Sequence, residues 1–117
     1  MNADAVKLLG IDIGGTKTAL VVGSLDGRID ERRVFPSRAE RGAAVMLKGI
    51  LAEAKALASR HSNVVAVGAS VGGPVDAERG LVLGPPNLPG WNEVHLEREL
   101  AEGLGLPARI EHDAKAC

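Results

Sequence analysis

Aromatic side chains are nearly absent from this 117-residue sequence, which has one Phe, one Trp and no Tyr. Proteins that bind single-stranded nucleic acid stack bases on aromatic side chains, so this composition argues against that function. The sequence also has a single cysteine, Cys117, which excludes an internal disulfide framework and a cysteine-based metal site. These shortages leave a core that is built almost entirely from Val, Leu, Ile and Ala.

Neither the charge nor the hydropathy of the chain points to DNA or to a membrane. The net charge is −1, and basic and acidic residues are mixed along the sequence, so no basic surface is expected. The apolar run 6–13 is short and contains Lys7 and Asp12, which argues against a signal peptide and against a membrane span. We therefore expect a cytoplasmic protein with one domain, residues 1–117, and with no nucleic acid or membrane as partner.

The spacing of apolar residues predicts an α/β domain. Strands are expected over 8–13, 16–23, 28–35, 63–69 and 108–112, and helices over 40–60 and around 96–104. The order β-β-β-α-β-α-β predicts a mixed five-stranded sheet with flanking helices. The first strand is expected to be buried on both faces, the apolar fourth strand to be interior, and the charged third strand to lie near an edge. Residues 70–91 are predicted to form a long loop with a strand-like run over 80–83.

A possible phosphate-binding loop follows the first strand. Gly14 and Gly15 allow a tight turn and a close approach of the backbone to a ligand. Successive free N–H groups in such a turn form an anion site, and Lys17 adds a positive charge beside it. A buried carboxylate on the preceding strand, Asp12, suits a hydrated Mg²⁺ that bridges phosphates. The sequence therefore favours a nucleotide-phosphate loop.

The same two glycines also suit an ordinary β-hairpin turn in which Lys17 is merely solvated. The two interpretations are compatible. Two better-known phosphate-binding loops are excluded. A P-loop needs Lys directly after Gly, whereas Thr16 separates Gly15 from Lys17, and the dinucleotide-binding pattern G-x-G-x-x-G is absent here.

Asp113 is the strongest candidate for a catalytic group. It directly follows the last strand and begins the short run 114–117, so it suits a helix N-cap that accepts backbone N–H bonds. The alternative is a general base that orients a hydroxyl nucleophile and accepts its proton during phosphoryl transfer. The neighbouring His112 offers a second acid–base group, although a structural role is the more usual one for a lone histidine.

The glycine- and proline-rich segments between residues 70 and 91 are candidates for contacts with a sugar. Prolines stiffen 84–91 and expose Asn87, whose amide can donate to and accept from hydroxyl groups. Trp91 could stack on a sugar face, but the core is the favoured place for a sole tryptophan. Gly73 lies in a glycine turn that lets backbone approach a ligand. The run 68–72 matches G-x-S-x-G around Ser70, but the chain has too few histidines to favour a hydrolase.

Four segments together resemble the N-terminal part of the ROK-family sugar kinases, which are glucokinase-like members of the actin and hexokinase superfamily. They are 10–17 (GIDIGGTK), 65–75 (VAVGASVGGPV), 86–91 (PNLPGW) and 111–114 (EHDA), in the family's order and with matching spacing. The resemblance covers residues 8–117. It implies the N-terminal half of an actin/hexokinase-like (ribonuclease H-like) fold, and a chain that is truncated before its C-terminal domain.

The resemblance implies that the protein uses ATP to phosphorylate a hexose, glucose or a related sugar, at its 6-hydroxyl. The residues that would hold the ATP phosphates and Mg²⁺ are Asp12, Gly14, Gly15, Thr16 and Lys17. Any zinc site would belong to the missing C-terminal part. A homodimer is compatible with the resemblance.

The resemblance also implies which residues bind the sugar. Gly73 and Asn87 would line the sugar pocket, and Asp113 would take the proton from the 6-hydroxyl, which makes the catalytic base the favoured role for this residue. The family usually has Asn where His112 and Lys115 stand, and His112 falls on a sugar-contacting position. Both substitutions bear on which sugar is bound and on whether the protein is active.

Length is the larger departure, because family kinases are about two to three times as long as this chain. Half of a cleft cannot align donor and acceptor, so we expect the 117 residues alone to be inactive. Two other functions remain open. One is a sugar-responsive regulator of the same family, although no room precedes the first strand for a DNA-binding helix-turn-helix. The other is a truncated sugar-binding module.

Overall fold

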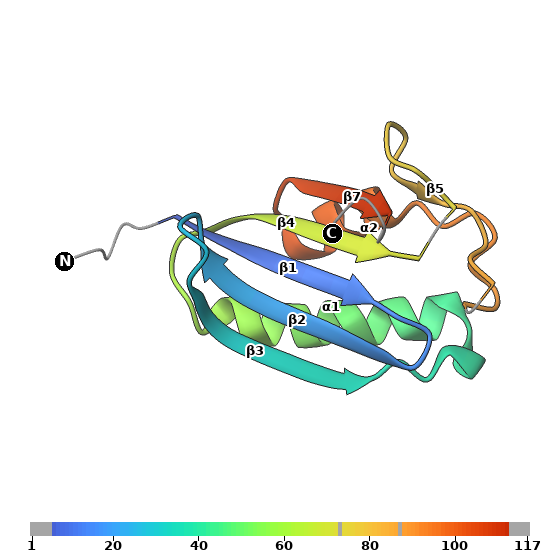
Figure 1. The fold of residues 1–117 in the computed structure, drawn as a ribbon, viewed down its shortest axis with the longest axis horizontal. Coiled ribbons are helices and arrows are strands. Elements are labelled where there is room, and N and C mark those ends of the chain that lie inside the picture. Colours follow the sequence, from blue (N-terminus) through green and yellow to red (C-terminus); the bar gives the residue numbers. More distant parts are fainter. Residues whose placement is uncertain (1–5, 73, 87, 113–117) are drawn as a thin grey trace.

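The computed structural model describes residues 6–72, 74–86 and 88–112. Five strands form one mixed sheet in the order β3-β2-β1-β4-β7 (Figure 1). Their bounds are Lys7–Ile13 (β1), Lys17–Ser24 (β2), Ile29–Pro36 (β3), Val64–Val71 (β4) and Ala108–His112 (β7). β1 pairs antiparallel with β2 and parallel with β4, and β4 pairs parallel with β7. The predicted fold class is confirmed, with β4 interior and β3 at an edge.

Only one face of the sheet is buried. The helices α1 (Ala43–Ser59) and α2 (Leu96–Leu104) lie behind the sheet in the view of Figure 1 and pack against its alternate residues. Leu9, Ile11 and Ile13 of β1 are at most 3% exposed, whereas Leu8 is 39% exposed and Asp12 is exposed. The prediction that this strand is buried on both faces is wrong, because its side chains alternate between a helix-covered face and an open one. Among the described residues, no helix is long and apolar enough to cross a membrane.

The first helix is shorter than predicted at its N-terminal end. Residues Ala39–Arg41 form a 3₁₀ turn, and Gly42 then adopts a φ of 90°, which is not helical. This glycine separates the 3₁₀ turn from α1, since a positive φ cannot be accommodated inside a right-handed helix. Leu47, Ile50, Ala54 and Leu57 of the predicted apolar repeat are then buried in the core, and Met46 is buried with them.

The long segment between β4 and α2 has structure of its own. β5 (Val75–Asp76) and β6 (Leu81–Val82) form a two-stranded sheet, and Val82 pairs with Val94 further along the chain. These pairs bring Leu88 and Trp91 back onto the main core, where each is at most 1% exposed. The segment is therefore anchored to the core at Val82, Leu88 and Trp91 rather than being a free loop.

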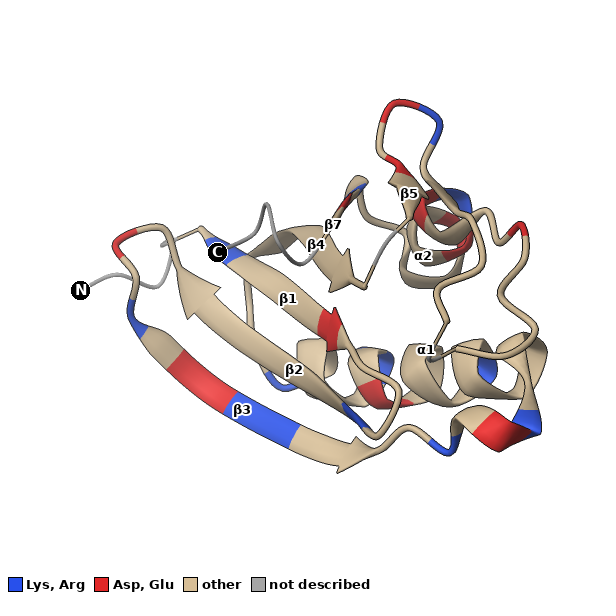
Figure 2. Cartoon of the chain, turned by 45° about the vertical axis from the view of Figure 1, so that its right-hand side comes forward, with Lys and Arg blue, Asp and Glu red and all other residues tan. Residues whose placement is uncertain are grey.

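The edge strand β3 carries a row of charged side chains (Figure 2). Glu31 accepts hydrogen bonds from Arg60, with Nη2 to Oε2 at 2.7 Å, and lies 2.8 Å from Nε2 of His61. The hydrogen bonds from Arg60 and then from His61 lower the pKa of Glu31 from its usual 4.5 to about 2. Arg33 forms a similar pair with Glu53 of α1. Ion pairs thus connect the edge of the sheet to α1 and to the turn that follows it.

These ion pairs predict a loss of stability in acid. Because the pKa of Glu31 is lower in the folded state than in the unfolded state, its contribution is complete above pH 4.5 and is lost as the pH falls toward about 2. We expect the urea midpoint to fall across this range. Glu31→Gln should lower the midpoint at pH 7 and remove part of the acid dependence, whereas Glu78→Gln, at an exposed position, should do neither. An acid profile in Glu31→Gln identical to that of the unsubstituted protein would refute this role.

Candidate phosphate-binding site

The Gly-Gly-Thr sequence forms the connection of the hairpin between β1 and β2. The backbone N–H of Gly14 donates to the carbonyl of Lys17 at 3.1 Å. A Cβ at Gly14 would lie 2.8 Å from the same carbonyl oxygen, so only glycine fits without a shift of the backbone. Thr16 and Lys17 are exposed, and Gly14 and Gly15 are half-buried. The predicted hairpin is confirmed, and its residues are accessible to a ligand.

A buried pair of hydroxyl groups fixes this hairpin to the segment after β3. Ser37 Oγ donates to the carbonyl of Gly14 at 2.6 Å, and the backbone N–H of Ser37 donates to the carbonyl of Thr16 at 2.9 Å. Thr18 Oγ lies 2.9 Å from Ser37 Oγ. Since the single hydroxyl proton of Ser37 is given to Gly14, Thr18 is the donor of that bond. Both side chains are at most 7% exposed, and the sequence did not identify Ser37 as part of the site.

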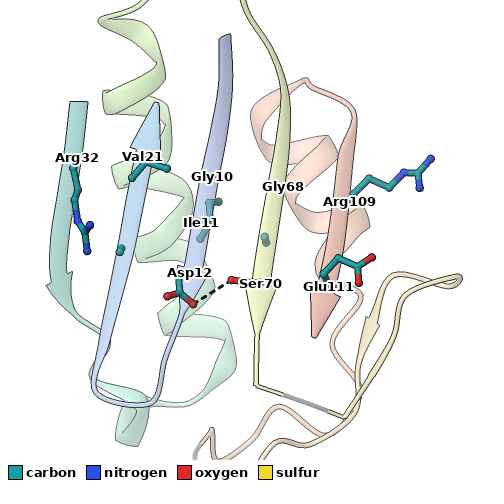
Figure 3. A pocket seen from close by; sticks show the side chains of 11 residues that line it. Gly10, Ile11, Asp12, Val21, Arg32, Gly68, Ser70, Arg109 and Glu111 are labelled. Carbon is teal, nitrogen blue, oxygen red and sulfur yellow. Dashed lines mark hydrogen bonds between the residues drawn. The ribbon is translucent and has the colours of Figure 1, made fainter. Parts of the chain in front are cut away.

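Asp12 lies on the open face of the sheet, at the end of β1 that leads into the hairpin (Figure 3). The expectation of a buried carboxylate is wrong, because Asp12 alternates with Ile11 and Ile13, which point into the core. Its Oδ1 accepts a hydrogen bond from Ser70 Oγ of β4 at 3.2 Å. The carboxylate is thus accessible to solvent and held on one side.

The open face beside Asp12 is hollow. A depression of about 430 Å³ is lined by residues of all five strands, among them Gly10, Gly68, Arg32, Arg109 and Glu111. Gly10 and Gly68 are neighbours on β1 and β4, and their lack of side chains makes the floor of the depression. The sequence predicted Asp12 here, but it did not identify Ser70, Arg109 or Glu111, which reach this face only through the pairing of the strands.

The chemistry of these residues fits a magnesium–phosphate complex. Mg²⁺ keeps several waters and needs only one or two carboxylates from the protein, and Asp12 offers one accessible carboxylate oxygen that makes no hydrogen bond within the described chain. A dedicated metal cage is not present, since the described residues contain no group of three or more His, Cys, Asp and Glu that could hold an ion. Lys17 and the backbone N–H of Gly15 are the groups available for phosphate oxygens, since the N–H of Gly14 is bonded to the carbonyl of Lys17.

Of the residues expected to bind the sugar, His112 lies within the described part of the chain. His112 is half-buried at the end of β7, opposite Val71, and lines a pocket of about 400 Å³ with Pro74, Val75 and Ala77. Asp12 and His112 both lie at the carboxyl ends of the parallel strands, where open α/β sheets place their ligands. Three further candidates, Gly73, Asn87 and Asp113, lie outside the described residues.

The fold and this site define an α/β domain with an accessible carboxylate at the mouth of a Gly-Gly-Thr-Lys hairpin. Residues 8–117 match the family model described as the ROK family. The chain belongs to the ROK family, which confirms the resemblance seen in its four motifs.

The proteins that this chain resembles include both a sugar kinase and a repressor. A glucokinase of Thermotoga maritima is 34% identical over 111 residues, which are 95% of this chain and 35% of that protein. A putative xylose repressor of Caldicellulosiruptor is 32% identical over 99% of this chain and 30% of the repressor. The crystal structure of a ROK glucokinase from Streptomyces griseus with glucose and AMPPNP superposes with a TM-score of 0.84, at 34% identity over 94% of this chain and 34% of that one. The chain therefore spans about a third of the length of these proteins.

Proposed function

We propose that this chain is the N-terminal domain of an ATP-dependent kinase that phosphorylates a hexose at its 6-hydroxyl. The observation that carries the proposal is the accessible carboxylate of Asp12 beside the hairpin of Gly14 and Lys17, in a chain of the ROK family. The glucokinase of Streptomyces griseus, whose crystal structure holds glucose and AMPPNP, supports the same substrates for this chain.

In the proposed mechanism the hairpin binds the donor. Lys17 and the backbone N–H of Gly15 would face the phosphates, while Gly14 permits the tight turn and gives its own N–H to the carbonyl of Lys17. Asp12 would hold the waters of Mg²⁺, and the ion would supply charge stabilisation at the phosphoryl group. The rigid attachment through Ser37 keeps these groups in place before the donor arrives. Little covalent chemistry is then required of the protein, because positioning and charge stabilisation account for most of phosphoryl-transfer catalysis.

On the basis of the family resemblance, the residues proposed to bind the acceptor sugar are Gly73, Asn87, His112 and Asp113. The carboxylate of Asp113 takes the proton of the 6-hydroxyl as that oxygen attacks the γ-phosphate. His112 takes a sugar-contacting position, and the size and hydrogen bonds of its ring differ from those of the asparagine that the family usually has there. We therefore expect this residue to influence the choice of sugar.

The proposal is tested by incubating the protein, at the full length that its gene encodes, with ATP, Mg²⁺ and glucose. We expect sugar-dependent ADP release and a sugar 6-phosphate, detected by a coupled assay and by ³¹P NMR. Residues 1–117 alone should give no ADP release above background, since aligned reactants react at effective molarities of about 10⁵–10⁸ M and one wall of a cleft supplies no such alignment.

The choice of sugar is tested in parallel with mannose and N-acetylated hexoses. A protein that binds these sugars without releasing ADP, and that shifts operator DNA in a gel, would contradict the kinase and support a regulator. ADP release by residues 1–117 alone would contradict the proposal that this chain forms only one half of the active-site cleft.

A further inference from the structure

Within the described part of the chain, Ser70 makes the one side-chain hydrogen bond to the carboxylate of Asp12. The two residues lie directly opposite each other on the parallel strands β1 and β4. Ser70 Oγ is 3.2 Å from Asp12 Oδ1, and the two side chains point toward each other on the open face (Figure 3). Because an ionised carboxylate only accepts hydrogen bonds, the serine hydroxyl is the donor.

This hydrogen bond restricts a side chain that is otherwise free to rotate. Asp12 is exposed, and Ser70 provides the hydrogen bond that holds its carboxylate. With Oδ1 held by Ser70, Oδ2 is left to face the depression beside the hairpin. Carboxylates that hold a metal or its waters are commonly fixed by such a hydrogen bond from a second group, and loss of that group costs about 10- to 100-fold in metal affinity or activity.

A role in stability alone explains the contact poorly. The bond between Ser70 and Asp12 is exposed to solvent, so water replaces it at little cost when the serine is removed. Ser37 offers a contrast, because its hydroxyl is buried and connects Thr18 with the carbonyl of Gly14. Removing Ser37 should affect folding, whereas removing Ser70 should act mainly on whatever Asp12 binds.

We propose that Ser70 is a positioning residue that orients the carboxylate of Asp12 toward the magnesium–phosphate complex of the donor. The inference rests on the proposed function, in which Asp12 holds the waters of Mg²⁺. Ser70 had no role in the sequence-based site, because the G-x-S-x-G pattern around it did not favour a hydrolase. The serine acts here through its neighbour and makes no bond to the substrate.

The test measures binding of Mn²⁺, used as a probe for Mg²⁺, to the full-length protein in the presence of ADP, by electron paramagnetic resonance. We expect Ser70→Ala to weaken Mn²⁺ binding about tenfold, at the lower end of the range because the contact is exposed. Ser70→Thr keeps the hydroxyl and should stay within about twofold of the unsubstituted protein. Ser59→Ala removes an exposed serine hydroxyl on α1 and is the matched control.

Two further measurements separate positioning from structure. The urea midpoint of Ser70→Ala should be nearly unchanged, and Ser70→Ala should have no additional effect in an Asp12→Asn background, since the two residues act as a unit. Unchanged Mn²⁺ binding in Ser70→Ala overturns the inference, even where the unsubstituted protein phosphorylates sugar. A tenfold loss in a protein without sugar-dependent ADP release supports the inference for a nucleotide site and contradicts the kinase. Absence of any Mn²⁺–ADP binding contradicts both.

Discussion

Replacing Asp113 with asparagine is expected to abolish sugar-dependent ADP release while sugar binding stays nearly unchanged. Asparagine has the shape and most of the hydrogen-bonding capacity of aspartate, so it can still contact a sugar hydroxyl. It cannot accept the proton that leaves the 6-hydroxyl, and loss of a general base typically costs about 10²- to 10⁴-fold in rate. The expected result is therefore a large fall in kcat with a sugar Kd that changes little.

The measurement pairs a coupled assay for ADP with calorimetric titration of the sugar, both on the full-length protein. Asp26→Asn is the control, because Asp26 lies in the turn between β2 and β3, where its carboxylate accepts a hydrogen bond from Ser24. Near-normal turnover in Asp113→Asn would remove the residue from the catalytic role and leave the helix N-cap as its function. A loss of sugar binding as large as the loss of turnover would make it a binding residue.

The order of the elements could be predicted from the sequence because local patterns determine it. Short apolar runs bounded by turn residues predict the strands, and apolar residues three and four apart from Leu47 to Ala58 predict α1. The faces of β1 could not be predicted in the same way. Its run from Leu8 to Ile13 is apolar apart from Gly10 and Asp12, and such a run is typical of a strand buried on both sides. Both helices pack on one face, and the other face stays open.

In the candidate site, too, features set by neighbouring residues could be predicted, and contacts between distant residues could not. The hairpin of Gly14 and Gly15 is a local feature, and the sequence alone predicts it. Ser37 and Ser70 act on the site across 23 and 58 residues of sequence, through the end of β3 and through the pairing of β1 with β4. Serine is common in turns and at strand ends, so no local pattern distinguishes these two from the others. Only the arrangement of the strands assigns them to Asp12 and to the hairpin.

Trp91 carries the largest expected effect on folding. Its side chain is fully buried in the main core, where Leu88 and Leu96 also lie. Trp91→Ala should lower the free energy of unfolding by about 3–5 kcal/mol, because it removes the apolar surface of an indole and leaves a cavity. This is a large part of the 5–15 kcal/mol that stabilises a typical domain. Urea denaturation followed by circular dichroism measures the change without relying on tryptophan fluorescence.

Trp91→Phe separates the core role from stacking on a sugar. The indole Nε1 has no hydrogen-bond partner among the described residues, so phenylalanine should fill part of the space without losing a bond that the structure shows. We expect Trp91→Phe to be destabilised less than Trp91→Ala and to bind sugar as the unsubstituted protein does. Weaker sugar binding in Trp91→Phe at unchanged stability would instead indicate stacking. Such a result would require the segment from Gly84 to leave the core, because an indole with no exposed surface cannot reach a ligand.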